Sequence, residues 1–246
     1  MKSISIVIPC YNCENFILNN IKKILKKLKF FNHKFEIILV NDGSSDFTLN
    51  KLKQSLKLNN KIKVVTYNKN IGKSFAIKKG IKKSKYNHII IIDNDLPYFE
   101  AFATIIEKLK QNYDLVFVNR RNKKSFLKRK MLSVYQILRF LIGYLVSIII
   151  RVKLRMNIDG GDTQAGLKGF KKIRNFGKIN FISKIFFFDL ELMYFYYILN
   201  KKIFSVPVKY EIPNSSSIKI FSVKRNFKIF LELFTVISKL KKLKII

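Results

Sequence analysis

The sequence predicts an α/β fold in which a doubly wound, mostly parallel sheet is flanked by helices. Short apolar runs alternate with segments of helical period through the first 120 residues, and each apolar run ends in a polar turn. The chain has 246 residues, 48% of them hydrophobic, which is enough to bury one compact core. Because no linker rich in Pro, Gly or Ser interrupts this pattern, we expect one domain over residues 1–220 and a basic amphipathic tail over residues 221–246.

Strands and helices are expected to alternate in the first half. The predicted strands are Ser3–Pro9, Phe35–Val40, Ile62–Tyr67, Asn87–Asp93 and Tyr113–Val118. The predicted helices, which carry most of their Lys residues on the polar face, are Phe16–Lys29, Thr48–Leu58, Lys73–Ser84 and Phe99–Gln111. A strand that returns through a helix normally lies parallel to its neighbour, so this order favours a parallel sheet.

The pattern changes after residue 121. In order, the chain then has a basic stretch, a long apolar segment, a block with Gly and Asp at Asp159–Gly169, an aromatic helix pattern at Phe186–Leu199, a short strand at Phe204–Val208 and a basic amphipathic pattern at Phe221–Lys244. The apolar segment, Met131–Ile150, contains one charge, Arg139, and has Lys and Arg on both flanks. A central Arg costs roughly 2.5 to 3.5 kcal/mol on insertion scales. We therefore interpret the segment as a helix in the plane of the membrane interface, with a spanning helix as the alternative.

The charge of the chain favours an anionic partner. Lys and Arg number 49 against 15 Asp and Glu, so the formal net charge is +34. Lys outnumbers Arg by 41 to 8, whereas recognition of guanine and bidentate recognition of phosphate favour Arg. An anionic membrane surface is therefore favoured over nucleic acid. Two Cys form no disulfide framework and no signal peptide pattern is seen, so we expect the cytoplasmic face of a membrane, with peripheral or monotopic attachment.

The few acidic residues gather where predicted strands end. Asp42 and Asp46 follow the second strand, and Asp93 and Asp95 follow the fourth. In open α/β sheets, ligands bind beyond the carboxyl ends of the strands, so these side chains are expected at one crevice. Mg²⁺ typically takes one or two carboxylates together with substrate phosphates. The alternative is that these Asp residues only stabilise turns.

Six ordered blocks within residues 3–220 carry a resemblance to a known family. They are SIVIPCYNCENFI, ILVNDGSSDFT, NIGKSFAIKKGIKKSK, IIIIDNDLP, DTQAGLKGFKK and FDLELMYFYYILNKKIFSVPVKY. Their order and spacing resemble glycosyltransferase family 2 and, within it, the dolichyl-phosphate mannose synthases and polyprenyl-phosphate glycosyltransferases. The resemblance implies a GT-A fold, with a nucleotide-sugar-binding half over about residues 1–120 and an acceptor half over about 121–220. It implies transfer of a hexose, with inversion, from a nucleotide sugar of the UDP-glucose or GDP-mannose type to a polyprenyl phosphate.

The resemblance also implies roles for individual residues on the donor side. The residues expected to hold the nucleotide sugar are Pro9, Tyr11, Glu14, Asp42, Lys73 and Asp93. Asp93 and Asp95 are expected to bind Mg²⁺ or Mn²⁺, which would stabilise the charge that develops on the leaving diphosphate. Asn41 stands where the family usually has the first Asp of a pair, a departure that bears on base recognition.

On the acceptor side, Arg129 and Ser133 have the four-residue spacing of the group's phosphate-binding pair, one helical turn apart. Arg120 and Lys209 match its other phosphate-binding bases, although Arg120 and Arg121 leave the register open by one residue. Asp162 either contributes to catalysis or pins structure. The catalytic residues expected from the resemblance are thus Asp95, Asp162 and Arg129.

Two other functions remain open at this point. A family 2 enzyme acting on a hydroxyl of a cell-surface glycan would need a general base, for which Asp162 and Asp189 are candidates. A basic nucleic-acid-binding protein rests on charge alone and is the remote alternative. The Cys10–Cys13 spacing could mark a redox motif, but the resemblance explains the same residues as the nucleoside-binding turn. A zinc site is disfavoured because it would also need His33 and His88, which lie in unrelated elements. Oligomeric state stays open.

Overall fold

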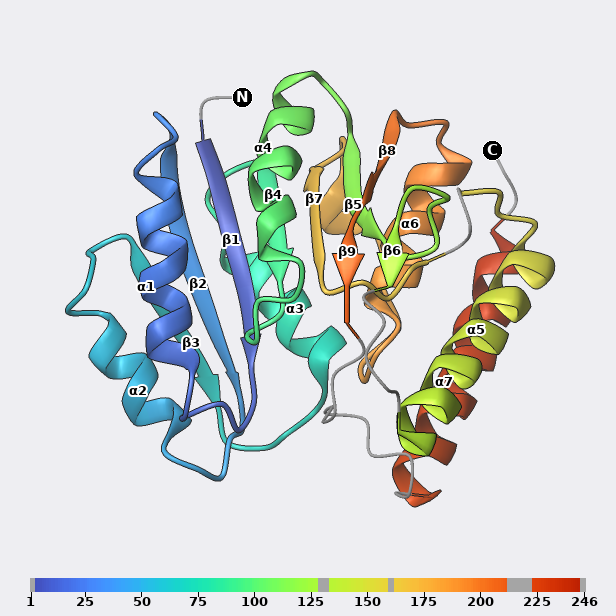
Figure 1. The fold of residues 1–246 in the computed structure, drawn as a ribbon, viewed down its shortest axis with the longest axis horizontal. Helices are drawn as coiled ribbons and strands as arrows, with labels where there is room; N and C mark the ends of the chain where they lie inside the picture. The colour runs from blue at the N-terminus through green and yellow to red at the C-terminus, as the bar shows by residue number, and fades with distance from the viewer. Residues whose placement is uncertain (1–2, 128–132, 159–161, 212–222, 244–246) are drawn as a thin grey trace.

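A computed structural model describes residues 3–127, 133–158, 162–211 and 223–243. Its centre is a seven-stranded sheet with the order β3-β2-β1-β4-β7-β5-β8 (Figure 1). The strands are β1 Ser3–Cys10, β2 Lys34–Asp42, β3 Ile62–Tyr67, β4 His88–Ile92, β5 Leu115–Asn119, β7 Leu167–Lys171 and β8 Ile203–Pro207. Every neighbouring pair is parallel except the two pairs made by β7. The predicted mostly parallel sheet is therefore confirmed.

Helices cover both faces of this sheet. They are α1 Ile17–Leu28, α2 Thr48–Ser55, α3 Lys73–Lys83, α4 Phe102–Lys110, α5 Val134–Leu154, α6 Phe188–Ile198 and α7 Val223–Lys242, with short 3-10 turns at Phe99–Ala101 and Phe176–Lys178. Alternation along β1 divides the core: Ile4 and Ile6 pack in a cluster with α1 and α4, whereas Val7 packs in a second cluster with α3 and α6. The sheet is thus doubly wound.

Strand β7 was missed by the sequence analysis, which placed only a block rich in Gly and Asp there. It lies between β4 and β5 and runs antiparallel to both. Its sequence, LKGFK, lacks the usual alternation because Lys168 is fully buried and Gly169 leaves room for α4. A Cβ at Gly169 would stand 2.6 Å from a side-chain carbon of Ile105. The strand is therefore defined by tertiary packing, which a pattern of apolar residues does not reveal.

Helices α5 and α7 lie side by side at one end of the molecule (Figure 1). Ser133 caps α5 in a capping box: its hydroxyl accepts from Gln136 N at 3.3 Å, and Gln136 Oε1 accepts from Ser133 N at 2.9 Å. Within the residues that the structure describes, no helix combines the length and apolar character needed to cross a membrane. The predicted amphipathic helix of the tail is present as α7, and its Leu233 and Val236 are buried in the same cluster as α6.

A two-stranded ribbon completes the described elements. It pairs β6 (Phe126–Leu127) with β9 (Lys209–Tyr210) in parallel. Strands β5 and β8 are parallel neighbours, and β4 and β5 run in the same direction because β7 is antiparallel to each. The carboxyl ends of β1, β2, β4, β5 and β8 consequently share one edge of the sheet, which is where ligands bind in open α/β folds.

Candidate active site

The loops that follow β1 and β2 are joined side by side at this edge. Asn12 N donates to Ser44 Oγ at 3.1 Å, and Glu14 Oε2 accepts from the backbone N–H of Phe47 at 2.7 Å. Pro9 is buried in β1, whereas Tyr11 is exposed beside it. The predicted nucleoside-binding residues of the first loop therefore lie on a surface where hydrogen bonds join the two loops. One carboxylate oxygen of Glu14 makes such a bond to the second loop.

Asp42, at the end of β2, organises the loop that leads into α3. Its carboxylate is 3% exposed and accepts from Tyr67 Oη at 2.8 Å, from Asn70 Nδ2 at 3.0 Å, and from the backbone N–H groups of Ile71 at 2.9 Å and Gly72 at 3.0 Å. Gly72 has φ +136°, which strongly favours glycine. Asp42 therefore fixes the turn before α3, whose first residue is Lys73. Its predicted contact with the donor's base stays a prediction.

The predicted metal motif follows β4. Asp93 N donates to the carbonyl of Gly166 at 2.9 Å, which ties the motif to the start of β7, and Asp95 lies exposed two residues further on. Lys73 Nζ contacts both oxygens of Asp93, at 2.7 Å and 2.9 Å. The carboxylate of Asp93 is thus paired with the ammonium group of Lys73.

A divalent metal fits Asp93 and Asp95 only if its other ligands come from elsewhere. Within the described residues, no group of three or more His, Cys, Asp and Glu side chains stands close enough to hold a metal by itself. Mg²⁺ commonly accepts such a site, because it takes one or two carboxylates and completes its coordination with substrate phosphates and water. The hard carboxylate donors therefore suit Mg²⁺ or Mn²⁺, with water completing the coordination in the absence of substrate and a diphosphate doing so in its presence.

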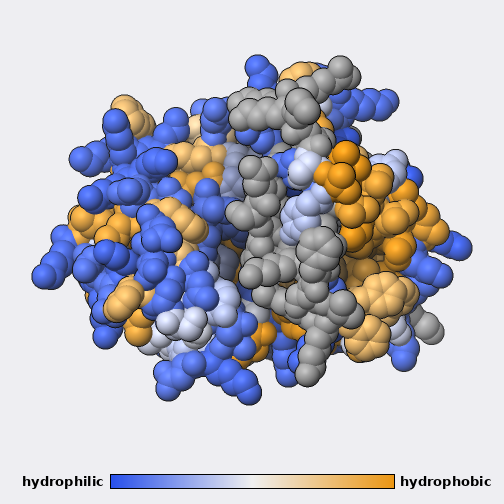
Figure 2. Space-filling model, turned by 60° about the horizontal axis from the view of Figure 1, so that its bottom comes forward, coloured by the Kyte–Doolittle hydropathy of each residue, from blue (hydrophilic) through white to orange (hydrophobic). Residues whose placement is uncertain are grey.

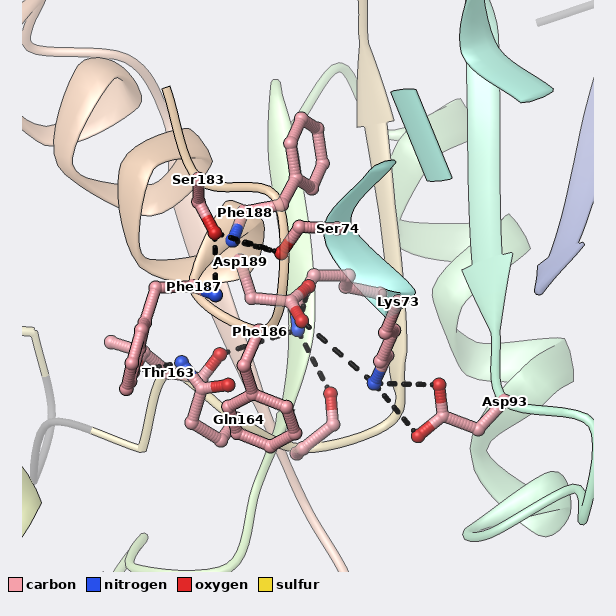
Figure 3. A network of polar contacts seen from close by, with 12 residues as sticks. Lys73, Ser74, Asp93, Thr163, Gln164, Ser183, Phe186, Phe187, Phe188 and Asp189 are labelled. Carbon is pink, nitrogen blue, oxygen red and sulfur yellow. Dashed lines mark hydrogen bonds and ion pairs between the residues drawn. The ribbon is translucent and has the colours of Figure 1, made fainter. Parts of the chain in front are cut away.

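A chain of alternating charges extends from Asp93 into the core (Figure 3). Lys73 Nζ lies 3.9 Å from Asp189 Oδ2, and Asp189 Oδ1 accepts from Lys168 Nζ at 2.6 Å. Burial by itself would lower the pKa of Lys73, but the carboxylates of Asp93 and Asp189 outweigh burial and raise the pKa above its ordinary value. Lys73 therefore carries positive charge at neutral pH.

Lys168 was not singled out by the sequence analysis. Its side chain is 1% exposed, and Nζ donates to the carbonyl of Ala165 at 2.8 Å and to that of Thr163 at 3.3 Å, besides Asp189. Three acceptors satisfy the three donors of a buried ammonium group. A lysine flanked by apolar residues in a short run was the available signal, but its partner Asp189 lies 21 residues further along the chain.

Asp162 and Arg120 form a second charged pair. Arg120 donates through Nε at 2.8 Å and through a terminal nitrogen at 2.7 Å, and its backbone N–H donates at 2.9 Å to the same carboxylate. Burial by itself would raise the pKa of Asp162, but Arg120 outweighs burial and lowers the pKa to about 2. A carboxylate with so low a pKa accepts protons poorly, which disfavours Asp162 as a general base.

The predicted acceptor-side bases leave the sheet at the same edge. Arg120 follows β5, and Lys209 follows the neighbouring parallel strand β8 and is exposed in β9. Ser133 is the N-cap of α5 and therefore precedes this helix. The prediction that Arg129 and Ser133 lie one turn apart places Ser133 inside a helix, which differs from this position. Arg129 lies outside the described residues. Arg121 donates to the carbonyl of Gly143 in α5 at 2.6 Å, which links the end of β5 to that helix.

The segment 182–186 closes the site from the side of α3 and was also missed. Glu191 accepts from Ile182 N at 2.8 Å and from Ser183 N at 2.9 Å, and so fixes the backbone at the start of this segment. Glu232 of α7 accepts from the next three backbone N–H groups, those of residues 184–186, at 2.7, 2.7 and 2.8 Å. The carbonyl of Ile185 in this segment accepts a hydrogen bond from the backbone N–H of Ser74, in the first turn of α3, at 3.2 Å. Helix α7 is thereby bonded to the segment that borders Lys73.

Comparison with known proteins gives a family match over most of this region. A model described as Glycosyl transferase family 2 matches residues 5–161. Among curated proteins, glycosyltransferase sll0501 of Synechocystis is 37% identical over 125 residues, 50% of this chain and 39% of that protein. An undecaprenyl-phosphate 4-deoxy-4-formamido-L-arabinose transferase of Photorhabdus laumondii is 33% identical over 135 residues, 54% of this chain and 42% of that protein. The chain thus matches about two fifths of the length of these relatives.

Solved structures show the same fold. Glucosyl-3-phosphoglycerate synthase from Mycobacterium tuberculosis, in complex with UDP, superposes with a TM-score of 0.64 at 14% identity, covering 96% of this chain and 80% of that one. Other structures of that synthase hold Mn²⁺ or Mg²⁺ together with UDP. Residues 1–349 of TarS from S. aureus superpose with a TM-score of 0.61 at 18% identity, covering 98% of this chain and 65% of that one. These likenesses confirm the predicted GT-A fold.

Proposed function

Because the chain belongs to glycosyl transferase family 2, we propose that it transfers a hexose from a nucleotide sugar to a polyprenyl phosphate at a membrane surface, with inversion. The observation that carries the proposal is that two groups of side chains share the carboxyl edge of the sheet. Asp93 and Asp95 follow β4 with Lys73 beside them, and the bases Arg120 and Lys209 follow β5 and β8. Carboxylates that suit a metal diphosphate lie on one side, and bases that suit a second phosphate lie on the other.

On the donor side, the chain's own groups position a diphosphate. The loops after β1 and β2 are bonded to each other, and Asp42 fixes the turn that delivers Lys73. A divalent metal, when bound at Asp93 and Asp95, neutralises the charge that grows on the leaving nucleoside diphosphate. Lys73 adds positive charge in a half-buried position, where it acts more strongly than in water.

On the acceptor side, the state of Asp162 favours a phosphate nucleophile. An acceptor phosphate is already anionic at neutral pH, so the enzyme needs to position it and to screen its charge, and no proton has to be removed. Asp162 holds Arg120 in a fixed geometry instead of acting as a base. The undecaprenyl-phosphate sugar transferases among the relatives support an acceptor of this class.

The surface of α5 and α7 supports a membrane as the place of reaction. Figure 2 shows apolar side chains gathered over the end of the molecule that these helices form. The exposed apolar side chains there are Val134, Ile137, Leu138, Phe140, Leu141, Ile142, Tyr144, Leu145 and Val152 of α5 and Phe227, Phe230, Leu231 and Phe234 of α7. Apolar patches of this kind mark interaction sites. Together with a net charge of +34, they suit an anionic lipid surface on which the helices lie flat.

A transfer assay tests the proposal. Radiolabelled UDP-glucose and GDP-mannose are each incubated with the chain, Mg²⁺ or Mn²⁺ and undecaprenyl phosphate in anionic vesicles, and label is counted in the organic phase. We expect metal-dependent label with one donor, and a loss of at least about a hundredfold in Asp95→Asn, because a metal contributes several kcal/mol to the transition state. Glu107→Gln, an exposed change on α4, is the matched control. Full activity of Asp95→Asn at saturating metal contradicts the assignment.

A hydroxyl acceptor is the second candidate, and Asp189 is the residue that favours it. Its Oδ2 is buried and has no hydrogen-bond partner within the described residues. An enzyme that deprotonates a hydroxyl shows a limb in its pH–rate profile that reports the base, whereas a phosphate acceptor does not require one. Absence of organic-phase label with either donor, combined with retained nucleotide-sugar hydrolysis, would transfer the assignment to this candidate.

A further inference from the structure

We propose that Lys73 is a built-in cation that occupies Asp93 in the metal-free enzyme and transfers to Asp189 when a divalent metal binds. The inference rests on the proposed metal site and deepens it. It assigns to Asp189 and Lys168 a positioning role, in which they receive Lys73 without contacting the metal themselves. Metal affinity is then set by a competition between two cations for one carboxylate.

The first observation is the position of Lys73. Its Nζ lies 2.7 Å and 2.9 Å from the two oxygens of Asp93, so it covers the atoms that a metal needs. A metal and an ammonium group at one carboxylate repel each other, and this repulsion is strong where water is partly excluded. The Lys73 side chain is 21% exposed and that of Asp93 27%. Binding of metal therefore requires Lys73 to have another place to go.

The second observation is the empty half of Asp189. Its Oδ1 is held by Lys168 at 2.6 Å, whereas Oδ2 is buried and lacks a hydrogen-bond partner within the described residues. Buried carboxylate oxygens are normally hydrogen-bonded, so Asp189 Oδ2 is able to accept a hydrogen bond from a further donor. Lys73 Nζ stands 3.9 Å from it. A movement of about 1 Å, easily made by a flexible lysine stem, would bring the pair to hydrogen-bond distance.

The third observation is that the receiving site is rigid. Lys168 Nζ is held by the backbone carbonyls of Thr163 and Ala165 as well as by Asp189, and these three residues are buried. The carboxylate of Asp189 therefore keeps its orientation whether or not Lys73 is bound to it. Figure 3 shows Lys73 between Asp93 and Asp189, with no other labelled side chain between the two carboxylates.

Mn²⁺ binding by the full chain, followed by electron paramagnetic resonance without donor or acceptor, tests the exchange. We expect Lys73→Gln to bind Mn²⁺ at least about threefold more tightly, because the competing cation is gone, and Lys73→Arg to stay near the native affinity. Asp189→Asn is expected to weaken binding at least about threefold, because Lys73 loses its second position. Lys78→Gln, which removes the same charge from α3 at a residue bonded to the carbonyl of Phe181, is the matched control and should change affinity by less than about twofold.

The decisive result is the double variant. If Asp189 acts through Lys73, then Asp189→Asn has no further effect on Mn²⁺ affinity in the Lys73→Gln background. A persisting effect would show that Asp189 acts on the metal by another route and would overturn the proposal. Weaker binding by Lys73→Gln would overturn it as well, and this arm stands even if Asp189→Asn fails to fold.

Failure here is distinguishable from failure of the proposed function. A native chain that binds no Mn²⁺ at millimolar concentration overturns the exchange, whereas the transfer assay with donor and acceptor reports on the reaction separately. Conversely, the predicted affinities in a chain without transferase activity would support the exchange and contradict the proposed function.

Discussion

Asp162→Asn should destabilise the protein by about 3 kcal/mol at pH 7. The substitution keeps the shape of the side chain but removes the charge that pairs with Arg120 at 2.7 and 2.8 Å. Removing one partner of a buried pair typically costs about 3 to 5 kcal/mol, and we expect the lower end because the Arg120 side chain is 30% exposed. The pKa shift gives an independent figure: a fall from 3.8 to about 2 corresponds to about 2 kcal/mol.

The pH dependence of this difference identifies its origin. Because the folded-state pKa of Asp162 is lowered, its contribution is fully present above the unfolded pKa of 3.8 and is lost as pH falls towards 2. We expect the difference between native and variant in urea unfolding to fall by about 1 kcal/mol between pH 7 and pH 3.

A difference below about 1 kcal/mol at pH 7, or one that does not shrink with acid, would refute this account of the pair. Glu107→Gln serves as the control for general effects of lost negative charge, since Glu107 is exposed on α4. Asp162→Asn also separates two possible uses of Asp162 in the reaction. A general base would lose kcat at every acceptor concentration, whereas a residue that holds Arg120 would chiefly raise the KM for the acceptor phosphate.

Three further changes test the surroundings of the site. Gly166→Ala should weaken Mn²⁺ binding and cost about 1 to 3 kcal/mol of stability, because the added Cβ would clash with Asp93 Oδ2. Equilibrium unfolding and Mn²⁺ titration check this, and an unchanged Mn²⁺ affinity would contradict it. Glu232→Ala should cost about 1 to 3 kcal/mol, because three backbone N–H groups lose their acceptor, with Glu232→Gln recovering part of the loss in thermal unfolding; equal losses in both variants would contradict this. Ser133→Asp should keep the cap of α5 and hence the stability, yet raise the KM for polyprenyl phosphate by charge repulsion; an unchanged KM would remove Ser133 from the acceptor site.

The sequence predicted the framework closely because the framework depends on local patterns. The strand predicted at Ile62–Tyr67 has the observed bounds, and the other predicted strands differ from the observed ones by no more than two residues at either end. The predicted helix at Phe99–Gln111 begins with a 3-10 turn, and its regular part starts at Phe102. Strand β7 was not predicted because Lys168 and Gly169 occupy positions where a buried strand normally carries apolar residues.

The site was predictable in its motif residues and not in their partners. Asp93 and Asp95 follow a strand of a parallel sheet, so their arrival at the carboxyl edge is a consequence of topology. That Asp162 holds Arg120 depends on two segments 42 residues apart. That Glu232 holds the backbone of residues 184–186 depends on the packing of α7 against α6, which an isolated acidic residue in a basic helix does not announce.

Composition and periodicity determined by themselves that this chain folds around a doubly wound, mostly parallel sheet, and the order of its motifs carried the resemblance to family 2 and hence the expected GT-A fold. These properties are carried by residues that are neighbours in the sequence, so they do not depend on the details of packing. Tertiary structure alone decided how the charges are paired. Lys73 contacts Asp93 and approaches Asp189 because α3, β4 and α6 converge at one edge. Contacts of this kind join residues 20 and more positions apart, and their geometry is set by how the helices pack on the sheet, which no local pattern encodes.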